Sequence, residues 1–274
     1  MTPLALSVAD PGRALPIAAA AVVLLMLAVW LLSIRLQDVS IIDPVWGPAL
    51  ALVGVVGLVA GDGSTGRRVL LAGMVVLWGG RLGWHLTVRK RHEPEEDRRY
   101  AVMREKQGDR FVLWSLRMVF GTQALLVLVV SLPLSVAAGV DDRMGLWAVP
   151  GVVVWAVGLA FETIGDAQLR AFKADPASRG QVMDRGLWRY TRHPNYFGDA
   201  CVWWGLWLVA VTASGVWWTA IGPAVMTLLL VRVSGAGLLE KDIGMRRPGY
   251  AAYIERTSGF VPLPPRKGPR GARS

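Results

Sequence analysis

The sequence is poor in the side chains that build disulfides and metal sites. Cys201 is the only cysteine among 274 residues, and the three histidines are His85, His92 and His193. A single cysteine excludes a disulfide within the chain and a site made of several thiolates. Cys201 lies in an apolar run, so we expect a buried thiol rather than a nucleophile. No histidine pair has metal-ligand spacing, and we predict no metal site.

Charge is also scarce, and what there is has a basic bias. Charged residues make up 18% of the chain against 53% hydrophobic residues, with 30 Lys and Arg, 20 Asp and Glu, and a net charge of +10. Such a charge suits nucleic acid only when it covers an exposed folded face. Here the basic residues fall in loops between apolar blocks. We therefore predict an integral membrane protein and no nucleic-acid partner.

Apolar blocks recur along the chain and define the expected fold. They cover residues 15–34, 41–60, 69–87, 112–138, 145–165, 197–213 and 216–236. Most approach the roughly 20 residues with which a helix crosses a bilayer. Backbone groups in lipid must bond within their own segment, so the blocks should be helices. The prediction is an all-α polytopic membrane bundle of about seven transmembrane helices, with six as the alternative.

The basic loops indicate orientation. If the N-terminus is outside, the segments 35–40, 88–110, 170–196 and 237–274 fall inside and hold 23 of the 30 Lys and Arg residues. Basic loops stay cytoplasmic, which predicts an N-out, C-in protein of the cell membrane. We expect one domain over residues 1–264 and a basic, disordered tail over 265–274, close to membrane lipids.

Charged residues at membrane depth are the first functional candidates, since they usually face a partner or a cavity. Asp43 precedes Pro44 at the start of the second block, as a pocket-facing acid, a helix N-cap, or both. Arg81 and His85 share one helix face, either toward a pocket or toward the membrane interface. The acidic run 93–97 is expected to be a solvated loop.

A charged stripe follows on the fifth block. Its members are Glu162, Asp166, Arg170 and Lys173, at spacings that place them along one side of a helix. One interpretation is a ladder of ion pairs. The other is a ligand-facing stripe, in which the acids bind ribose or amide groups and the cations bind phosphates.

The densest polar segment runs from residue 184 to 199. Its predicted cofactor-binding side chains are Arg189, Arg192, His193, Asn195, Tyr196 and Asp199. Arginine forks and amide donors suit an anionic cofactor, and aromatic rings offer stacking faces. Pro194 should begin a helix with Asn195 and Asp199 one turn apart at its N-terminus, where a phosphate is favoured. No GxGxxG follows a strand, which excludes a Rossmann site.

These motifs resemble a known family. The run Thr191-Arg192-His193-Pro194-Asn195-Tyr196-Phe197-Gly198-Asp199, together with 173–176, 186–188, 237–242, 246–253, Asp38 and 43–47, resembles the DUF1295 proteins, bacterial relatives of the steroid 5α-reductase C-terminal domain. The resemblance extends from about residue 35 to 264. The shorter His-Pro-x-Tyr core is also similar to isoprenylcysteine carboxyl methyltransferases and sterol C14-reductases.

The resemblance implies a seven-helix membrane reductase. It would bind NADPH from the cytosol and pass hydride to the β-carbon of an enone in a lipophilic, steroid- or isoprenoid-like substrate entering from the bilayer. It carries a cofactor role to Asp166 and Lys173 on the fifth block and to Asn195 and Asp199. Glu240 and Tyr250 of the closing segment are further cofactor-binding candidates. Glu162 replaces an Asn of the steroid reductases.

Catalytic candidates are Asp43, His85 and Tyr100. A protonated Asp43, or a Tyr or His donor, would stabilise charge developing on the substrate carbonyl. Two other classes stay open. One is a methyltransferase that uses S-adenosylmethionine, which needs fewer cations than NADPH. The other is a non-enzymatic membrane protein, such as a transporter or a scaffold. The oligomeric state stays open too.

Overall fold

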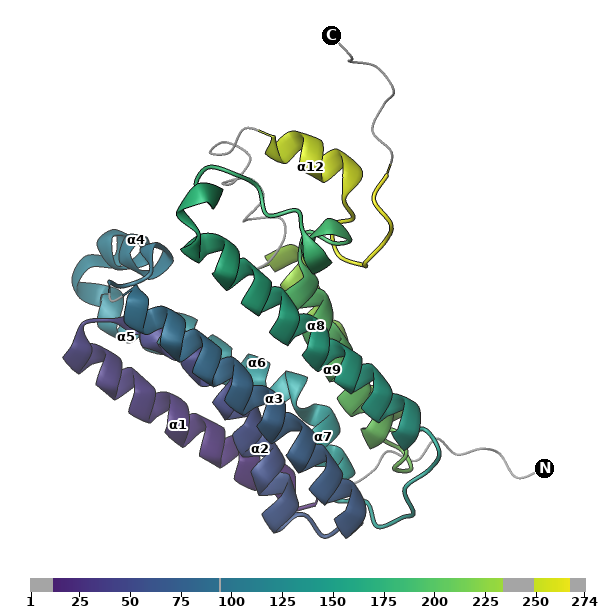
Figure 1. Ribbon diagram of the computed structural model, residues 1–274. Coiled ribbons are helices and arrows are strands. Elements are labelled where there is room, and N and C mark those ends of the chain that lie inside the picture. Colours follow the sequence, from purple (N-terminus) through teal and green to yellow (C-terminus); the bar gives the residue numbers. More distant parts are fainter. Residues whose placement is uncertain (1–11, 94, 234–248, 267–274) are drawn as a thin grey trace. The chain divides into compact units, whose positions relative to one another are not determined.

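The computed structural model describes residues 12–93, 95–233 and 249–266 (Figure 1). The helices are α1 (Ala14–Leu36), α2 (Trp46–Ala60), α3 (Thr65–His92), α4 (Arg98–Gln107), α5 (Phe111–Ser115), α6 (Thr122–Val130), α7 (Leu132–Ala137), α8 (Ala148–Ala174), α9 (Pro194–Ala210), α10 (Ile221–Leu228) and α12 (Tyr250–Arg256). Short 3₁₀ or π turns extend several of them, including Val39–Val45 before α2 and Leu116–Gly121 between α5 and α6. These ranges contain no strand, and the all-α prediction is confirmed for them.

Five helical stretches are long and apolar enough to cross a membrane. They are Ala14–Leu36, Val39–Ala60, Thr65–His92, Arg98–Val130 and Ala148–Ala174. They correspond to the first five apolar blocks, as expected for a membrane protein. The last two blocks form shorter helices, α9 with 17 residues and the apolar stretch Trp217–Arg232. Seven spans and the N-out orientation therefore stay predictions.

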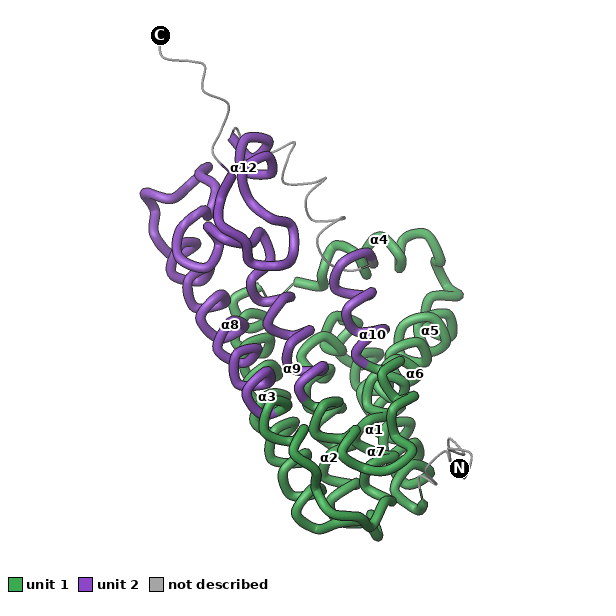
Figure 2. Tube along the Cα trace, turned by 90° about the vertical axis from the view of Figure 1, so that its right-hand side faces the viewer, with its two compact units in different colours: residues 1–151, 206–222 green, residues 152–205, 223–274 purple. Residues whose placement is uncertain are grey.

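The contacts divide the chain into two compact units (Figure 2). Unit 1 comprises residues 1–151 and 206–222, and unit 2 comprises 152–205 and 223–274. Helices α8 and α9 each contribute to both. The predicted single domain over 1–264 stays a prediction, and the predicted tail lies outside the described residues from 267 onward.

In unit 1, α2 and α3 pack at very short distance. A Cβ atom on Gly47 would lie 2.6 Å from the carbonyl oxygen of Gly79, and one on Gly79 would lie 2.4 Å from that of Gly47. Only glycine leaves room for these backbones. Small residues at such contacts are typical of membrane helices, whose association depends on close packing rather than on escape from water.

A buried arginine ties together one end of unit 1. The side chain of Arg67 is fully buried, and it donates to Thr212 Oγ1 at 3.2 Å, to the Val140 carbonyl at 2.9 Å and to a carboxylate oxygen of Asp142. The other Asp142 oxygen accepts from Ser214 N at 2.8 Å and Ser214 Oγ at 2.7 Å. Burial alone would raise the pKa of Asp142, but the hydrogen bonds from Ser214 and Arg67 outweigh it and hold that pKa below its ordinary value.

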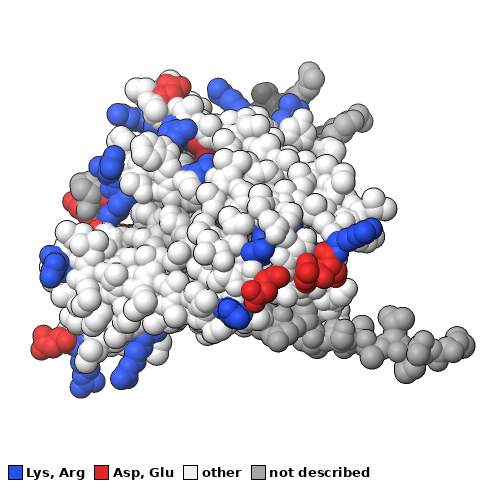
Figure 3. Space-filling model, turned by 90° about the horizontal axis from the view of Figure 1, so that it is seen from below, with Lys and Arg blue, Asp and Glu red and all other residues white. Residues whose placement is uncertain are grey.

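The surface outside these contacts is largely apolar. Charged side chains occupy a small part of the face seen in Figure 3. Large apolar side chains are exposed on the helices, among them Leu24 at 66%, Val59 at 78% and Trp84 at 67%. Soluble proteins seldom expose so much contiguous apolar surface. These side chains are placed as lipid-facing residues would be.

In unit 2, α8 and α9 also approach through glycines. A Cβ atom on Gly158 would lie 2.5 Å from the Gly198 carbonyl oxygen. Beyond the end of α8, Trp188 Nε1 donates to the Gly165 carbonyl at 3.0 Å, and the Tyr253 hydroxyl of α12 donates to the Trp188 carbonyl. Helix α12 and the 184–192 segment are thereby joined to α8.

Candidate functional sites

The first polar cluster lies in unit 1 around Asp43. The Tyr100 hydroxyl donates to Asp43 Oδ1 at 2.9 Å, and Arg99 Nη2 donates to Oδ2 at 3.0 Å. The N-cap interpretation of Asp43 was wrong. Asp38 caps the 3₁₀ turn by accepting from Ser40 N at 2.8 Å, and the N-cap residue of α2 is Val45, which makes no side-chain cap bond. Because Asp38, five residues earlier, begins the helical turn, the Asp43 carboxyl group caps no helix and instead accepts from Tyr100 and Arg99.

The acidic run after α3 is docked onto this turn. Glu96 accepts from Val39 N at 2.8 Å and forms an ion pair with Arg104 at 2.8 Å. Asp97 accepts from the Arg99 backbone N and Nε, each at 2.9 Å. The prediction of a solvated loop over 93–97 was therefore wrong for these two acids. The Glu96 carboxylate finds its donors on other segments, which the linear order of residues does not reveal, whereas Asp97 binds an arginine two residues later.

Ionised acids surround the cluster. Lys90 forms an ion pair with Asp38 at 2.8 Å. Burial alone would raise the pKa of Asp38, but the hydrogen bonds from Lys90 and Ser40 hold it below its ordinary value. Burial alone would also raise the pKa of Asp97, but the hydrogen bonds from Arg99 outweigh this effect and hold that pKa below its ordinary value. Both carboxylates are thus acceptors, not proton donors, near neutral pH.

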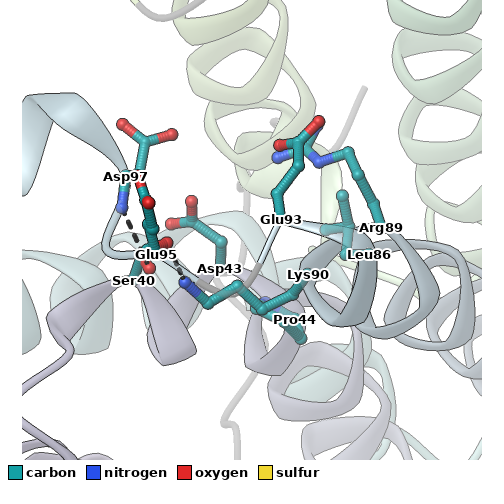
Figure 4. Close-up of a pocket in the computed structure, with 9 residues that line it drawn as sticks. All are labelled: Ser40, Asp43, Pro44, Leu86, Arg89, Lys90, Glu93, Glu95 and Asp97. Carbon is teal, nitrogen blue, oxygen red and sulfur yellow. Dashed lines mark hydrogen bonds between the residues drawn. The ribbon is translucent and has the colours of Figure 1, made fainter.

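A small polar pocket opens beside Asp43. Its cavity volume is about 50 Å³, and it is lined by Ser40, Asp43, Pro44, Leu86, Arg89, Lys90, Glu93, Glu95 and Asp97. Figure 4 shows the Asp43 carboxylate and the Lys90 amino group between the Ser40 side and the Arg89–Glu93 side. On this measure about 10–15 Å³ holds one water, so the pocket has room for solvent or a small ion.

The three catalytic candidates are thus only partly brought together. Asp43 and Tyr100 are hydrogen-bonded, and Tyr100 is 7% exposed. His85 is half-buried on α3, one turn after Arg81, and is not part of the pocket lining. Arg99 was missed by sequence reasoning. Its adjacency to Tyr100 was the one available signal, and its pairing with Asp43 depends on how α4 folds back.

The second cluster lies in unit 2, on α8 and α9. Glu162 is 3% exposed, Asp166 7% and Asp199 9%. Asn195 Nδ2 donates to Asp166 Oδ1 at 3.1 Å. The His193 ring, itself 5% exposed, stacks on Tyr196 with ring centroids 5.2 Å apart. Two predicted groups, one from each helix, therefore meet in the structure.

The stripe on α8 does not form an ion-pair ladder. Arg170 and Lys173 are exposed while Glu162 and Asp166 are buried. Neither cation forms an ion pair with an acidic residue in the described ranges, so the ladder interpretation was wrong. The acids lie where α8 meets α9, whereas the cations lie beyond that contact at the helix end.

Arg192 has a structural task. Its Nη1 donates to the Thr257 carbonyl at 2.6 Å and to the Ile254 carbonyl at 3.2 Å. Buried Thr191 donates to the Phe260 carbonyl at 2.8 Å. These bonds fasten the segment after α12 to the predicted motif. Arg189 is exposed, whereas Tyr250 is buried beside Tyr253. Glu240 lies outside the described residues.

The helices and the two clusters define an all-helical membrane protein with polar side chains buried near helix ends. A family model described as a protein of unknown function, DUF1295, matches residues 29–257. The chain belongs to this family, and the resemblance to DUF1295 proteins drawn from its motifs is confirmed. No curated protein and no solved structure matches the chain.

Proposed function

We propose that this protein is a membrane-embedded, NADPH-dependent reductase of a C=C bond conjugated to a carbonyl in a lipophilic, steroid- or isoprenoid-like substrate. The observation that carries the proposal is the hydrogen bond from Asn195 to Asp166 within a buried set of acids. The proposal includes seven spans, an N-out orientation and a cofactor site on the cytoplasmic side of the cell membrane.

The unit 2 cluster has the groups that a dinucleotide requires. Carboxylate oxygens have several acceptor positions, so Asp166 and Glu162 can accept from ribose hydroxyls and from the nicotinamide amide as well as from groups of the protein. Arg170, Lys173 and Arg189 are exposed cations of the same unit, available to phosphates. When bound, the cofactor supplies hydride, and the residues described here hold and orient it.

The unit 1 cluster has the groups that proton handling requires. Tyr100 is an O–H donor, Asp43 an acceptor that orients it, and Arg99 a cation that binds the other carboxyl oxygen of Asp43. A donor placed against the oxygen of an enone stabilises the charge that develops there. Tyr100 has a single O–H, which donates to Asp43 here, so it reaches a substrate oxygen only by turning away from Asp43, and a protonated Asp43 is the other candidate donor. His85 stays a candidate for the same task.

The proposed number of spans has support from the Arg67 end of unit 1. Asp142 precedes α8, Ser214 follows α9, and the two residues are hydrogen-bonded. A chain that leaves this end along α8 has therefore returned to it by the end of α9. If α8 spans the bilayer, α9 spans it too. Its 17 residues cover about 26 Å at 1.5 Å per residue, close to the hydrocarbon thickness.

A second candidate function is methyl transfer from S-adenosylmethionine. The observation in its favour is that backbone carbonyls occupy Nη1 of Arg192, which leaves fewer cations for phosphates. Buried acids suit the ribose of either cofactor. The number of cations that contact the ligand separates the two candidates.

The test is thermal unfolding of the purified protein in detergent with NADPH, NADH or S-adenosylmethionine, because a ligand that binds the folded state raises its stability. We expect NADPH alone to raise the unfolding temperature. Asn195→Ala should abolish the increase while the ligand-free protein still unfolds cooperatively. Thr163→Ala, an exposed position on α8, should keep it. An increase with S-adenosylmethionine alone would replace the reductase by a methyltransferase, and no increase with any of the three would reject both.

A further inference from the structure

The segment after α12 lies beside the predicted motif and has exposed side chains that the proposed function does not use. Leu263 N donates to the Tyr190 carbonyl at 3.0 Å, and Arg192 N donates to the Ser258 carbonyl at 2.9 Å. Residues 257–263 therefore run alongside 190–192 in unit 2 and end next to Tyr190. Figure 1 shows this segment, in yellow, after α12.

Large apolar side chains are exposed on these two adjoining segments. Tyr190 is 44% exposed, Val261 52% and Leu263 51%. They lie on loops beyond the helix ends rather than on a membrane-spanning helix. The Tyr190–Leu263 hydrogen bond places two of the three side by side. An interface between water and lipid is where aromatic and aliphatic side chains on such loops are most favourable.

Basic residues outnumber acidic ones around these side chains, and Asp184 and Glu255 are the acids nearby. Arg185 and Arg266 are exposed and form no ion pair with an acid in the described ranges. Asp184, which precedes Arg185, forms an ion pair with Arg256, and the Arg256 carbonyl accepts from Arg266 N at 2.9 Å. These contacts connect the segments that carry Arg185 and Arg266. In the sequence, Glu255 is the last acid, and Arg256, Arg266, Lys267, Arg270 and Arg273 follow it.

We propose that Tyr190, Val261 and Leu263, with Arg185 and Arg266, form a membrane-surface contact that inserts its apolar side chains among the headgroups of anionic phospholipids. We call this set the C-terminal surface. Apolar side chains beside an excess of basic over acidic residues are the combination that anionic interfaces bind. Another protein that covered this surface would have to supply acids and apolar groups together, whereas an anionic leaflet supplies both everywhere. The proposal is independent of the reductase proposal.

The experiment places an environment-sensitive nitrobenzoxadiazole label at Leu263→Cys in a Cys201→Ala background, reconstituted in vesicles of phosphatidylcholine with or without phosphatidylglycerol. We expect a blue shift of the label only with phosphatidylglycerol. Arg185→Gln and Arg266→Gln should each raise the phosphatidylglycerol content needed for half of the shift. Each removed charge should weaken the affinity for the anionic lipid by about fivefold. A label at Val59→Cys, an exposed position of α2, should not respond to phosphatidylglycerol.

Three outcomes would overturn the proposal. The first is an emission maximum that is the same in neutral and anionic vesicles. The second is a shift that both arginine substitutions leave unchanged, which would show that charge plays no part. The third is a shift that follows the protein-to-lipid ratio, which would assign the surface to a second copy of the chain. Thermal unfolding of each labelled protein checks its fold, and Val261→Cys replaces Leu263→Cys if that variant does not fold.

Discussion

Tyr100 and Asp43 lie 57 residues apart in the sequence and share a hydrogen bond of 2.9 Å. Tyr100 belongs to α4, and Asp43 belongs to the 3₁₀ turn before α2. The bond therefore fixes α4, a short helix with a strongly charged sequence, to the start of a membrane helix. Arg99 completes the arrangement by binding the other oxygen of Asp43.

Substitution Tyr100→Phe removes the donor and keeps the ring. If Tyr100 stabilises charge on the substrate, the reduction rate should fall by roughly 10²-fold or more, the range of a positioned proton donor. The free energy of unfolding should fall by about 1–3 kcal/mol, the range for a hydrogen bond lost from a buried carboxyl group. Turnover of an enone lipid with NADPH and thermal unfolding measure the two effects. Tyr190→Phe, at an exposed ring, is the matched control, and undiminished turnover by Tyr100→Phe would remove Tyr100 from the chemistry.

Helix packing in unit 1 leads to a second prediction. Gly79→Ala should separate α2 from α3, because its Cβ would meet the Gly47 carbonyl oxygen at 2.4 Å. The backbones must move apart, so we expect a marked fall in unfolding temperature. Gly80→Ala is the control, since a Cβ there meets nothing within 4 Å. Alanine also favours a helix over glycine by about 1 kcal/mol, so this variant should be as stable as the parent or more so. Equal behaviour of the two variants would contradict the close packing.

Elements of secondary structure were the most predictable part of the molecule. The first five apolar blocks correspond to helices, because length and hydropathy alone decide that a segment suits lipid. Family membership was also accessible, since the motif around His193 is local in sequence. Of the candidate sites, the Asn195–Asp166 contact was partly foreseen, because each residue lies at a helix position that the 3.6-residue period fixes.

Contacts between distant segments were not predictable. Arg67 lies just before the third apolar block, where its sequence position gives no sign of burial, yet it is fully buried and donates to acceptors more than 70 residues away. Glu96 was assigned to solvent, yet it binds Val39 N. Arg192 was assigned to an anionic cofactor, yet its Nη1 binds one carbonyl in α12 and one directly after it. In each case the partner is a backbone group or a residue from another segment, and backbone acceptors leave no pattern in a sequence.

Acid should weaken the Arg67 end of unit 1. The folded-state pKa of Asp142 is lowered, so its contribution to stability is fully present above the ordinary carboxyl pKa and is lost as the pH falls through the folded value. Thermal unfolding measured from neutral pH to below pH 4 should show this loss in the parent protein. Asp142→Asn should be less stable at neutral pH and should lack this part of the acid dependence. Asp141→Asn, at the exposed neighbouring position, should follow the parent. An identical pH profile for Asp142→Asn would contradict the assignment.

The topology prediction can be tested with single cysteines in a Cys201→Ala background. With seven spans and the N-terminus outside, Arg143→Cys before α8 and Trp217→Cys after α9 face outward, and Arg185→Cys between them faces the cytosol. All three positions are exposed. An impermeant maleimide added to intact cells should label the first two and reach Arg185→Cys only after permeabilisation. The Asp142–Ser214 hydrogen bond is the physical reason that positions 143 and 217 should behave alike. If Trp217→Cys instead behaved like Arg185→Cys, α9 would not cross the membrane, and that bond would have to be broken in the membrane-bound protein.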